Sequence, residues 1–278
     1  MQALSSLCVF AMMTGCVADE TLVEDPNEDS YVADLSDPCT APIGRPPTTL
    51  HADPFYQKYL NAQGIPILSS AAVNNTALRR ACQMVAVMLA ARADVSRAMV
   101  ARDARLAIIG RYELTTDIPE YRNLYSEYPG TDWNVRTRGL GGTLGRPVGA
   151  TSEENLLCLS GDVYRGEDIT VHEFAHTIYN VGIVPTESSF AVRLRKAFDV
   201  AGLLGTWKGT FAATNVDEYW AEGIQDWFDV NLERIPGDGL HNEINTRSEL
   251  LARDAGLYQL ASEIFPSTPV PPCPTKPI

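Results

Sequence analysis

The stretch His172-Glu173-Phe174-Ala175-His176 decides how this chain is interpreted. In an α-helix, residues four positions apart lie about 40° apart around the axis and one turn apart in height. His172 and His176 therefore present two imidazoles to one ion. Glu173 is rotated by about 100° from His172, so its carboxylate reaches a water on that ion without binding the ion itself. The stretch predicts a zinc centre with Glu173 as general base.

The flanking residues place this stretch inside a helix. Asp168 is a suitable N-cap and Gly182 a suitable stop, which gives a helix of three to four turns. Apolar residues at near-helical spacing predict packing against a core: Val171, Phe174, Ala175 and Ile178. The alternative is an ordinary amphipathic helix with two partly buried histidines.

A catalytic zinc needs a third protein ligand. An extended three-histidine motif is excluded, because Tyr179 and Gly182 stand where it requires Gly and His. The stretch from Asn215 to Phe228 is the better source. It predicts a second helix whose buried face carries Trp220, Ile224, Trp227 and Phe228, while another face carries Glu218, Glu222 and Gln225.

Two assignments of the third ligand are compatible with this second helix. In the first, Glu218 binds zinc and Glu222, one turn on, accepts a hydrogen bond from a ligating imidazole and fixes its tautomer. In the second, Asn215 and Glu218 form a capping box, and Glu222 becomes the ligand. We favour Glu218.

The two stretches together resemble a known family. His-Glu-Phe-Ala-His at 172–176, followed about forty residues later by Glu-Tyr-Trp-Ala-Glu at 218–222, is similar to the gluzincin metallopeptidases, and most to the protease domain of the anthrax lethal factor group. The resemblance covers roughly residues 165 to 230. It implies zinc held by His172, His176 and Glu218, Glu173 as base, and Glu222 in support of a ligand.

One residue departs from that pattern. The lethal factor group has a tyrosine shortly before the ligand glutamate that stabilises the oxyanion, but the corresponding position here is Phe211, which has no hydroxyl group to donate. The oxyanion donor is therefore unassigned, with four weak candidates: Tyr164, Tyr179, Tyr219 and His241.

The resemblance implies an α+β, zincin-like metallopeptidase domain, which we place over residues 46–265. Residues 105–114 read as a strand, and 74–100 as a helical region interrupted around Asp94. Its expected core positions are Leu78, Cys82, Val85, Leu89 and Val100. Residues 192–200 and 246–260 predict further helices. The glycine-rich segment 138–143 is an edge strand that pairs with extended substrate, or an ordinary turn.

The beginning of the chain differs from this domain. Residues 17–44 contain 8 acidic residues and no Lys or Arg, and so carry most of the net charge of -13. We expect an acidic, disordered tether over 17–45. No basic stripe is available to neutralise phosphates, so we expect no nucleic-acid partner.

Residues 1–16 resemble a bacterial lipoprotein signal peptide. An apolar run from Leu4 to Met13 ends in Met13-Thr14-Gly15-Cys16, although no Lys or Arg precedes it. The resemblance implies export and a lipid on Cys16 that anchors the protein at the cell surface or outer membrane. A simple secretory signal, which gives a secreted protein, is the alternative.

Four other cysteines remain in the predicted mature chain: Cys39, Cys82, Cys158 and Cys273. An even count in an exported protein favours two disulfides, whose pairing the spacing leaves open. Cys273 lies in a Pro-rich tail, residues 266–278, that a disulfide would hold in place.

These predictions describe an exported zinc metalloendopeptidase, expected to be a monomer, that acts on a peptide or protein substrate. Two alternatives stay open. One is a catalytically weak or inactive zinc-binding surface lipoprotein, and the other is an amidase that acts on cell-wall peptides.

Overall fold

The computed structural model describes residues 38–274. The predicted signal peptide, the expected lipid site at Cys16 and the expected tether up to residue 37 lie outside the described residues, as does the end of the Pro-rich tail.

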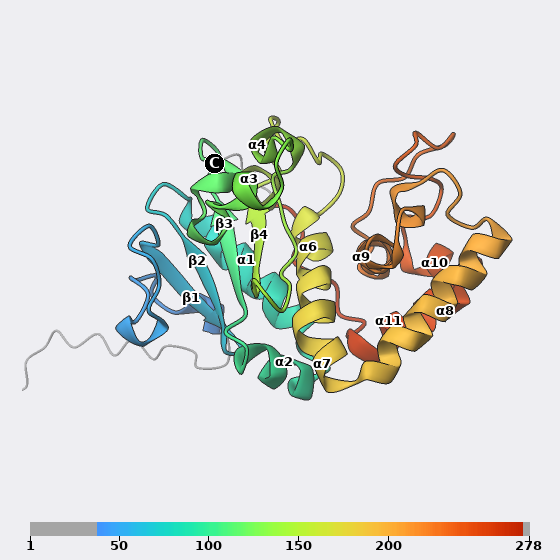
Figure 1. The fold of residues 1–278 in the computed structure, drawn as a ribbon, viewed down its shortest axis with the longest axis horizontal. Coiled ribbons are helices and arrows are strands. Elements are labelled where there is room, and N and C mark those ends of the chain that lie inside the picture. Colours follow the sequence, from blue (N-terminus) through green and yellow to red (C-terminus); the bar gives the residue numbers. More distant parts are fainter. Residues whose placement is uncertain (1–37, 275–278) are drawn as a thin grey trace, which may run out of the picture. The chain divides into compact units, whose positions relative to one another are not determined.

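A four-stranded mixed sheet forms the first half of the domain (Figure 1). Its strands are β1 (Lys58–Ala62), β2 (Ile65–Ser69), β3 (Arg105–Ile109) and β4 (Val148–Ser152), in the order β1-β2-β3-β4. β1 and β2 form an antiparallel hairpin, whereas β3 runs parallel to both β2 and β4. The central strands are apolar on both faces, as expected for strands that are covered on both sides.

Side chains alternate along the strands and so divide the interior into two cores. Ile67, Leu106 and Ile108 join the larger core, which faces the helices. Leu68, Ala107 and Ile109 point to the other face, into a smaller core. Segments without long helices cover that face: two 3₁₀ turns (Thr115–Asp117 and Pro119–Tyr121), α3 (Leu124–Glu127) and α4 (Trp133–Arg136).

The predicted strand 105–114 is too long at its C-terminal end. β3 stops at Ile109, and the backbone N–H of Gly110 donates to the Glu113 carboxylate at 2.7 Å. The Glu113 side chain thus takes the place of a neighbouring strand as the hydrogen-bond partner of Gly110, and the chain turns.

The helical region after the hairpin consists of α1 (Asn75–Met88) and α2 (Ala93–Val100). The predicted interruption exists but lies earlier, at residues 89–92, so Asp94 belongs to the first turn of α2. The expected core positions are buried except Val100, which is 40% exposed. That prediction was wrong, because Val100 ends α2 at the surface, where it packs over Gly64 of the hairpin turn.

A longer helical run follows α5 (Glu153–Leu156). It begins as α6 (Ile169–Thr177), becomes π-helical over Ile178–Ile183 and ends with α7 (Val184–Thr186). Gly182 therefore does not stop the helix, as its sequence context predicted. A Cβ there would lie 2.6 Å from Val95 and 2.9 Å from Met99, so this glycine instead lets α2 approach the π-helical segment.

The second half of the domain is helical. It comprises α8 (Ser188–Leu204), a 3₁₀ turn (Phe211–Ala213), α9 (Val216–Trp227), α10 (Arg247–Arg253) and α11 (Ala255–Ile264). α8 is longer than the predicted helix 192–200, and Val192 faces outward. The helices expected over 246–260 are present as α10 and α11. In Figure 1, α9 is seen end-on beside the upright α6.

Two disulfides join the four expected cysteines, Cys39 to Cys82 and Cys158 to Cys273. Cys39 is buried against α1, and Gly44 bridges Tyr59 of β1. The Cys158–Cys273 bond joins the Pro-rich tail to the rest of the domain, and the Pro271 carbonyl of the tail accepts from Arg80, which also pairs with Asp168 at the N-terminus of α6. Disulfides of this kind persist outside the reducing cytosol.

Within residues 38–274, no helix combines the length and apolar character that crossing a lipid bilayer requires.

Candidate metal centre

The N-terminal cap of α6 fixes the position of the two histidines. The Asp168 carboxylate accepts from the backbone N–H groups of Thr170 and Val171, as the sequence predicted for an N-cap. Its other oxygen pairs with the buried Arg80 guanidinium at 2.8 Å. Four apolar residues of the run have no exposed surface: Val171, Phe174, Ala175 and Ile178. His172 and His176 therefore project from a helix that is held at its cap and along its buried face.

α9 brings the carboxylate to this helix. The indole N–H of Trp220 donates to the Ala175 carbonyl at 3.1 Å, which ties α9 directly to α6. Asn215 caps α9 by accepting from the backbone N–H groups of Asp217 and Glu218. The Glu218 side chain does not complete a capping box, because it points to the imidazoles instead.

Three donor atoms converge between the two helices. His172 Nε2 lies 3.0 Å from Glu218 Oε2, His176 Nε2 lies 3.3 Å from the same oxygen, and the two Nε2 atoms are 3.2 Å apart. Among the described residues, these three form the group of His, Cys, Asp or Glu side chains that could hold a metal ion. Tetrahedral zinc with bonds of about 2.0 Å requires donors about 3.3 Å apart. The donor types and their spacing fit zinc.

Hydrogen bonds within the site shift the pKa values of His172 and Glu218 in opposite directions. Burial lowers the pKa of His172, but hydrogen bonds with Glu218 and Glu222 outweigh burial and raise that pKa well above its usual value. Burial likewise raises the pKa of Glu218, and the hydrogen bonds with both imidazoles outweigh it and hold the pKa far below the usual range. The lowered pKa favours the carboxylate form of Glu218, which is the form that binds a metal.

Glu173 lies beside the donors without joining them. It is 8% exposed, and burial raises the pKa of its carboxyl group. Its side chain packs on Gly139, where an added Cβ would lie 2.9 Å from Glu173 Cγ. A carboxylate with a raised pKa and some solvent access is suited to accept and return a proton.

The glycine-rich segment 138–143 covers this side of α6. Leu140 exchanges both backbone hydrogen bonds with Ala150 of β4, at 3.1 and 2.7 Å, so the segment extends the sheet at its edge. A Cβ on Gly141 would lie only 2.4 Å from His176 Cβ, and one on Gly142 would lie 2.9 Å from Thr177. The glycines let this segment, which is joined to β4 by a single isolated bridge, pass directly over the helix that carries the histidines.

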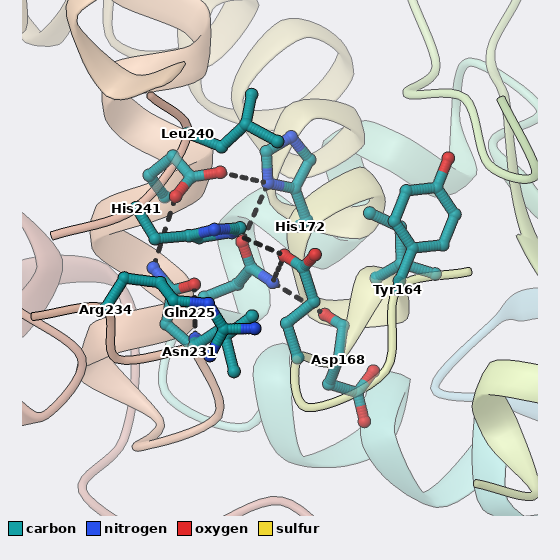
Figure 2. Close-up of polar contacts among 12 residues, drawn as sticks. Tyr164, Asp168, His172, Gln225, Asn231, Arg234, Leu240 and His241 are labelled. Atoms are coloured by element: carbon teal, nitrogen blue, oxygen red, sulfur yellow. Dashed lines mark hydrogen bonds and ion pairs between the residues drawn. The ribbon is translucent and has the colours of Figure 1, made fainter. Parts of the chain in front are cut away.

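The second nitrogen of His172 faces α9. Its Nδ1 is 2.9 Å from the side-chain oxygen of Gln225 (Figure 2) and 3.4 Å from Glu222. The sequence predicted Glu222 as this partner and missed Gln225, which is nearer. The signal was available, since Gln225 follows Glu222 by three residues on the same helical face, but carboxylates are the better-known partners of metal-bound imidazoles.

The candidate oxyanion donors are mostly held elsewhere. Tyr219 donates its hydroxyl proton to Asp254 at 2.7 Å, and the Tyr179 ring packs against Phe190 and Trp220 in the core.

The other two candidates are also engaged. The Thr137 hydroxyl donates to the Gly139 carbonyl, so the Tyr164 hydroxyl, 3.0 Å away, donates to Thr137. His241 Nε2 lies 3.6 Å from Glu167, whose carboxylate raises the pKa of His241. Phe211, at the position where a tyrosine was expected, stacks on His172 with ring centres 6.3 Å apart.

Comparison with known protein families finds no match, and no curated protein matches the sequence. Among solved structures, the chain is similar to the Pro-Pro endopeptidase PPEP-2 from Paenibacillus alvei, with a TM-score of 0.44 and 18% sequence identity over 67% of this chain and 91% of that chain. A likeness of this size does not establish an activity, so the function is inferred from the geometry of the site.

Proposed function

We propose that this protein is an exported zinc metallopeptidase in which His172, His176 and Glu218 bind the ion and Glu173 is the general base. The observation that carries the proposal is the convergence of two imidazole nitrogens and one carboxylate oxygen at 3.0–3.3 Å from one another. A set of two histidines and one glutamate is typical of catalytic rather than structural zinc.

The residues around this set have separable roles in hydrolysis. A zinc ion held by these residues would supply Lewis-acid chemistry, acidifying a water and polarising a peptide carbonyl. The Glu173 carboxylate would take a proton from the attacking water and return it to the leaving amine. Glu222 and Gln225 hold the His172 ring in orientation from behind. The Phe211 ring packs on His172 and keeps that side of the site apolar.

The edge segment supports a peptide as substrate. In the hydrogen-bonded pair of Leu140 with Ala150, the neighbouring residues direct their N–H and C=O groups away from β4. Those of Gly141 have no hydrogen-bond partner within residues 38–274. An extended peptide can therefore add to this edge by main-chain hydrogen bonds. This placement suits an endopeptidase, because the chain can continue on both sides of the site.

The proposed location rests on separate observations. Two disulfides favour an oxidising compartment. The sequence at Met13-Thr14-Gly15-Cys16 suits a lipid anchor, and an acidic tether would hold a monomeric domain of residues 46–265 off the membrane surface.

The test compares the purified protein with its Glu173→Gln variant. We expect about one zinc per chain in both, and cleavage of unstructured peptides by the wild type that a chelator abolishes. The variant should lose at least roughly three orders of magnitude in rate, because the proton relay is removed while the ligands remain. Glu263→Gln on α11, which alters a surface ion pair with Arg193, is the matched control and should cleave normally.

The outcomes separate the alternatives. Normal turnover by Glu173→Gln refutes the assignment of the base. Zinc binding without cleavage of any peptide favours the inactive surface protein, an outcome with which the engaged tyrosines are compatible. Cleavage of cell-wall fragments but not of ordinary peptides identifies the amidase.

A further inference from the structure

We propose that Gln225 is a positioning residue for the metal centre: its side-chain amide fixes the tautomer and ring orientation of His172. This inference rests on the proposed function, because it assigns Gln225 a role in holding a zinc ligand. Gln225 lies on α9 and has no exposed surface. A fully buried amide must satisfy both of its ends, so its orientation is informative.

The orientation of the amide follows from its partners. Gln225 Nε2 lies 3.3 Å from Glu167 Oε2 and 3.3 Å from the backbone carbonyl of Asp168. The Asp168 carbonyl can only accept a hydrogen bond. The Glu167 carboxylate, which also faces His241, is an acceptor as well. The amide therefore directs its NH₂ group at these two acceptors, and its oxygen must point the other way. Figure 2 shows this arrangement, with Gln225 between His172 and the Asp168 carbonyl.

The tautomer of His172 then follows. Gln225 Oε1, 2.9 Å from His172 Nδ1, can only accept, so Nδ1 carries the proton. Without an ion, Nε2 can donate its own proton to the Glu218 carboxylate. A bound ion takes the place of that proton, so the lone pair is then on Nε2, the atom that faces His176 and Glu218. A neutral imidazole with its lone pair toward the other donors is the form that binds a metal.

Gln225 is better placed for this role than Glu222. Glu222 Oε1 is 3.4 Å from Nδ1, and its other oxygen accepts from Asn231 at 3.2 Å. Gln225 is closer, and its two donor contacts lie at the cap of α6, the helix that carries His172. Gln225 thus couples the orientation of the His172 ring to the backbone at the start of α6, the helix that carries His172.

The experiment uses the full chain and two readouts besides activity. The first is the zinc dissociation constant, measured by competition with a chelator. The second is the proton on His172 Nδ1, observed by long-range ¹H–¹⁵N NMR, which 4 histidines make tractable. We expect a slowly exchanging Nδ1 proton in the wild type. Gln225→Met keeps the unbranched shape of the side chain but removes the acceptor, and it should weaken zinc binding by roughly 10- to 100-fold and expose that proton to exchange.

Two further variants serve as comparisons. Glu222→Gln should have the smaller effect on both readouts. Tyr121→Phe removes a buried hydrogen bond to the Val148 carbonyl in the other core, so it controls for a general loss of stability and should leave zinc affinity unchanged.

The outcomes are distinct. Wild-type zinc affinity and an unchanged Nδ1 proton in Gln225→Met overturn the inference, as does a larger effect of Glu222→Gln. Should Gln225→Met not fold, an unprotonated Nδ1 in the wild type also overturns it. A wild type that binds no zinc refutes the proposed function, whereas its Nδ1 signal still tests the contact with Gln225.

Discussion

α6 and α9 both contribute to one site, but they depend on different information. α6 supplies two donors and the base from five consecutive residues, so helix geometry alone places them together. α9 supplies its oxygen from a position 46 residues after His172, and only the packing of α9 on α6 brings Glu218 within 3.0 Å of that imidazole. Local helix geometry fixes the part of the site on α6, whereas the part on α9 depends on contacts between the two helices.

The largest effect is expected where the two helices meet at the ion. Glu218→Ala removes the α9 oxygen and should weaken zinc binding by more than the roughly 100-fold that loss of an outer partner costs. Peptide cleavage should fall with it. Asp217→Ala, one residue earlier on the same helix, is the control and should bind zinc normally in a chelator competition. Equal affinities of the two variants would show that α9 contributes no ligand.

A smaller effect is expected from the glycine-rich segment 138–143 that covers α6. Gly141→Ala places a Cβ 2.4 Å from His176 Cβ, so the segment or the helix must move. A displaced ligand should lower the rate of peptide cleavage at saturating zinc by at least about tenfold. Gly145→Ala, two residues after that segment, meets nothing within 4 Å and should cleave at the wild-type rate. If both variants behave alike, the close approach at Gly141 has no bearing on the site.

The two N-caps should differ in their contribution to stability. Asp168→Ala leaves the buried Arg80 without its partner and should lower the free energy of unfolding by about 3–5 kcal/mol. Asn215→Ala removes an exposed cap and should cost about 1 kcal/mol. Denaturant titration of both variants measures the difference. Similar losses would contradict the view that α6 is the more firmly held helix.

The smallest effect concerns pH and a carboxyl group that does not contact the donors. Burial raises the pKa of Asp226 on α9 well above its usual value, so the folded protein keeps a proton that the unfolded chain loses. The stabilisation that protonated Asp226 gives is complete below the pKa of this group in the unfolded chain. It declines as the pH rises toward the pKa of Asp226 in the folded protein. Asp226→Asn should flatten that decline while still accepting from Asn231. Unfolding titrations at pH 4 and pH 7 test this, and parallel wild-type and variant profiles would contradict it.

Several features of the fold could be predicted from the sequence because they depend on residues only three or four positions apart. The α+β class, the buried faces of α6 and α9, and the cap at Asp168 follow from spacings of three and four residues. The errors fall at the ends of elements. Gly182 was taken as a helix stop and Val100 as a core residue, because a sequence does not show which neighbouring element packs at that point.

Among the site residues, the sequence singled out His172, Glu173, His176 and Glu218, and the structure brings them together. It left open the competition between Glu218 and Glu222, since both lie on one face of α9. It also missed Gln225 as the nearer partner of His172. An amide becomes informative only when its two acceptors are known, and both lie at the start of the other helix.

The sequence by itself determined the imidazole pair with its adjacent carboxylate, and that four cysteines were available to pair, because these depend on local helix geometry and on composition. The tertiary structure decided which carboxylate completes the site, which side chain holds His172, how the cysteines pair, and how closely Gly141 approaches His176. The physical reason is distance along the chain. Helical periodicity fixes neighbours within a few residues, whereas contacts over 35 (Gly141 to His176) to 115 residues depend on how whole elements pack.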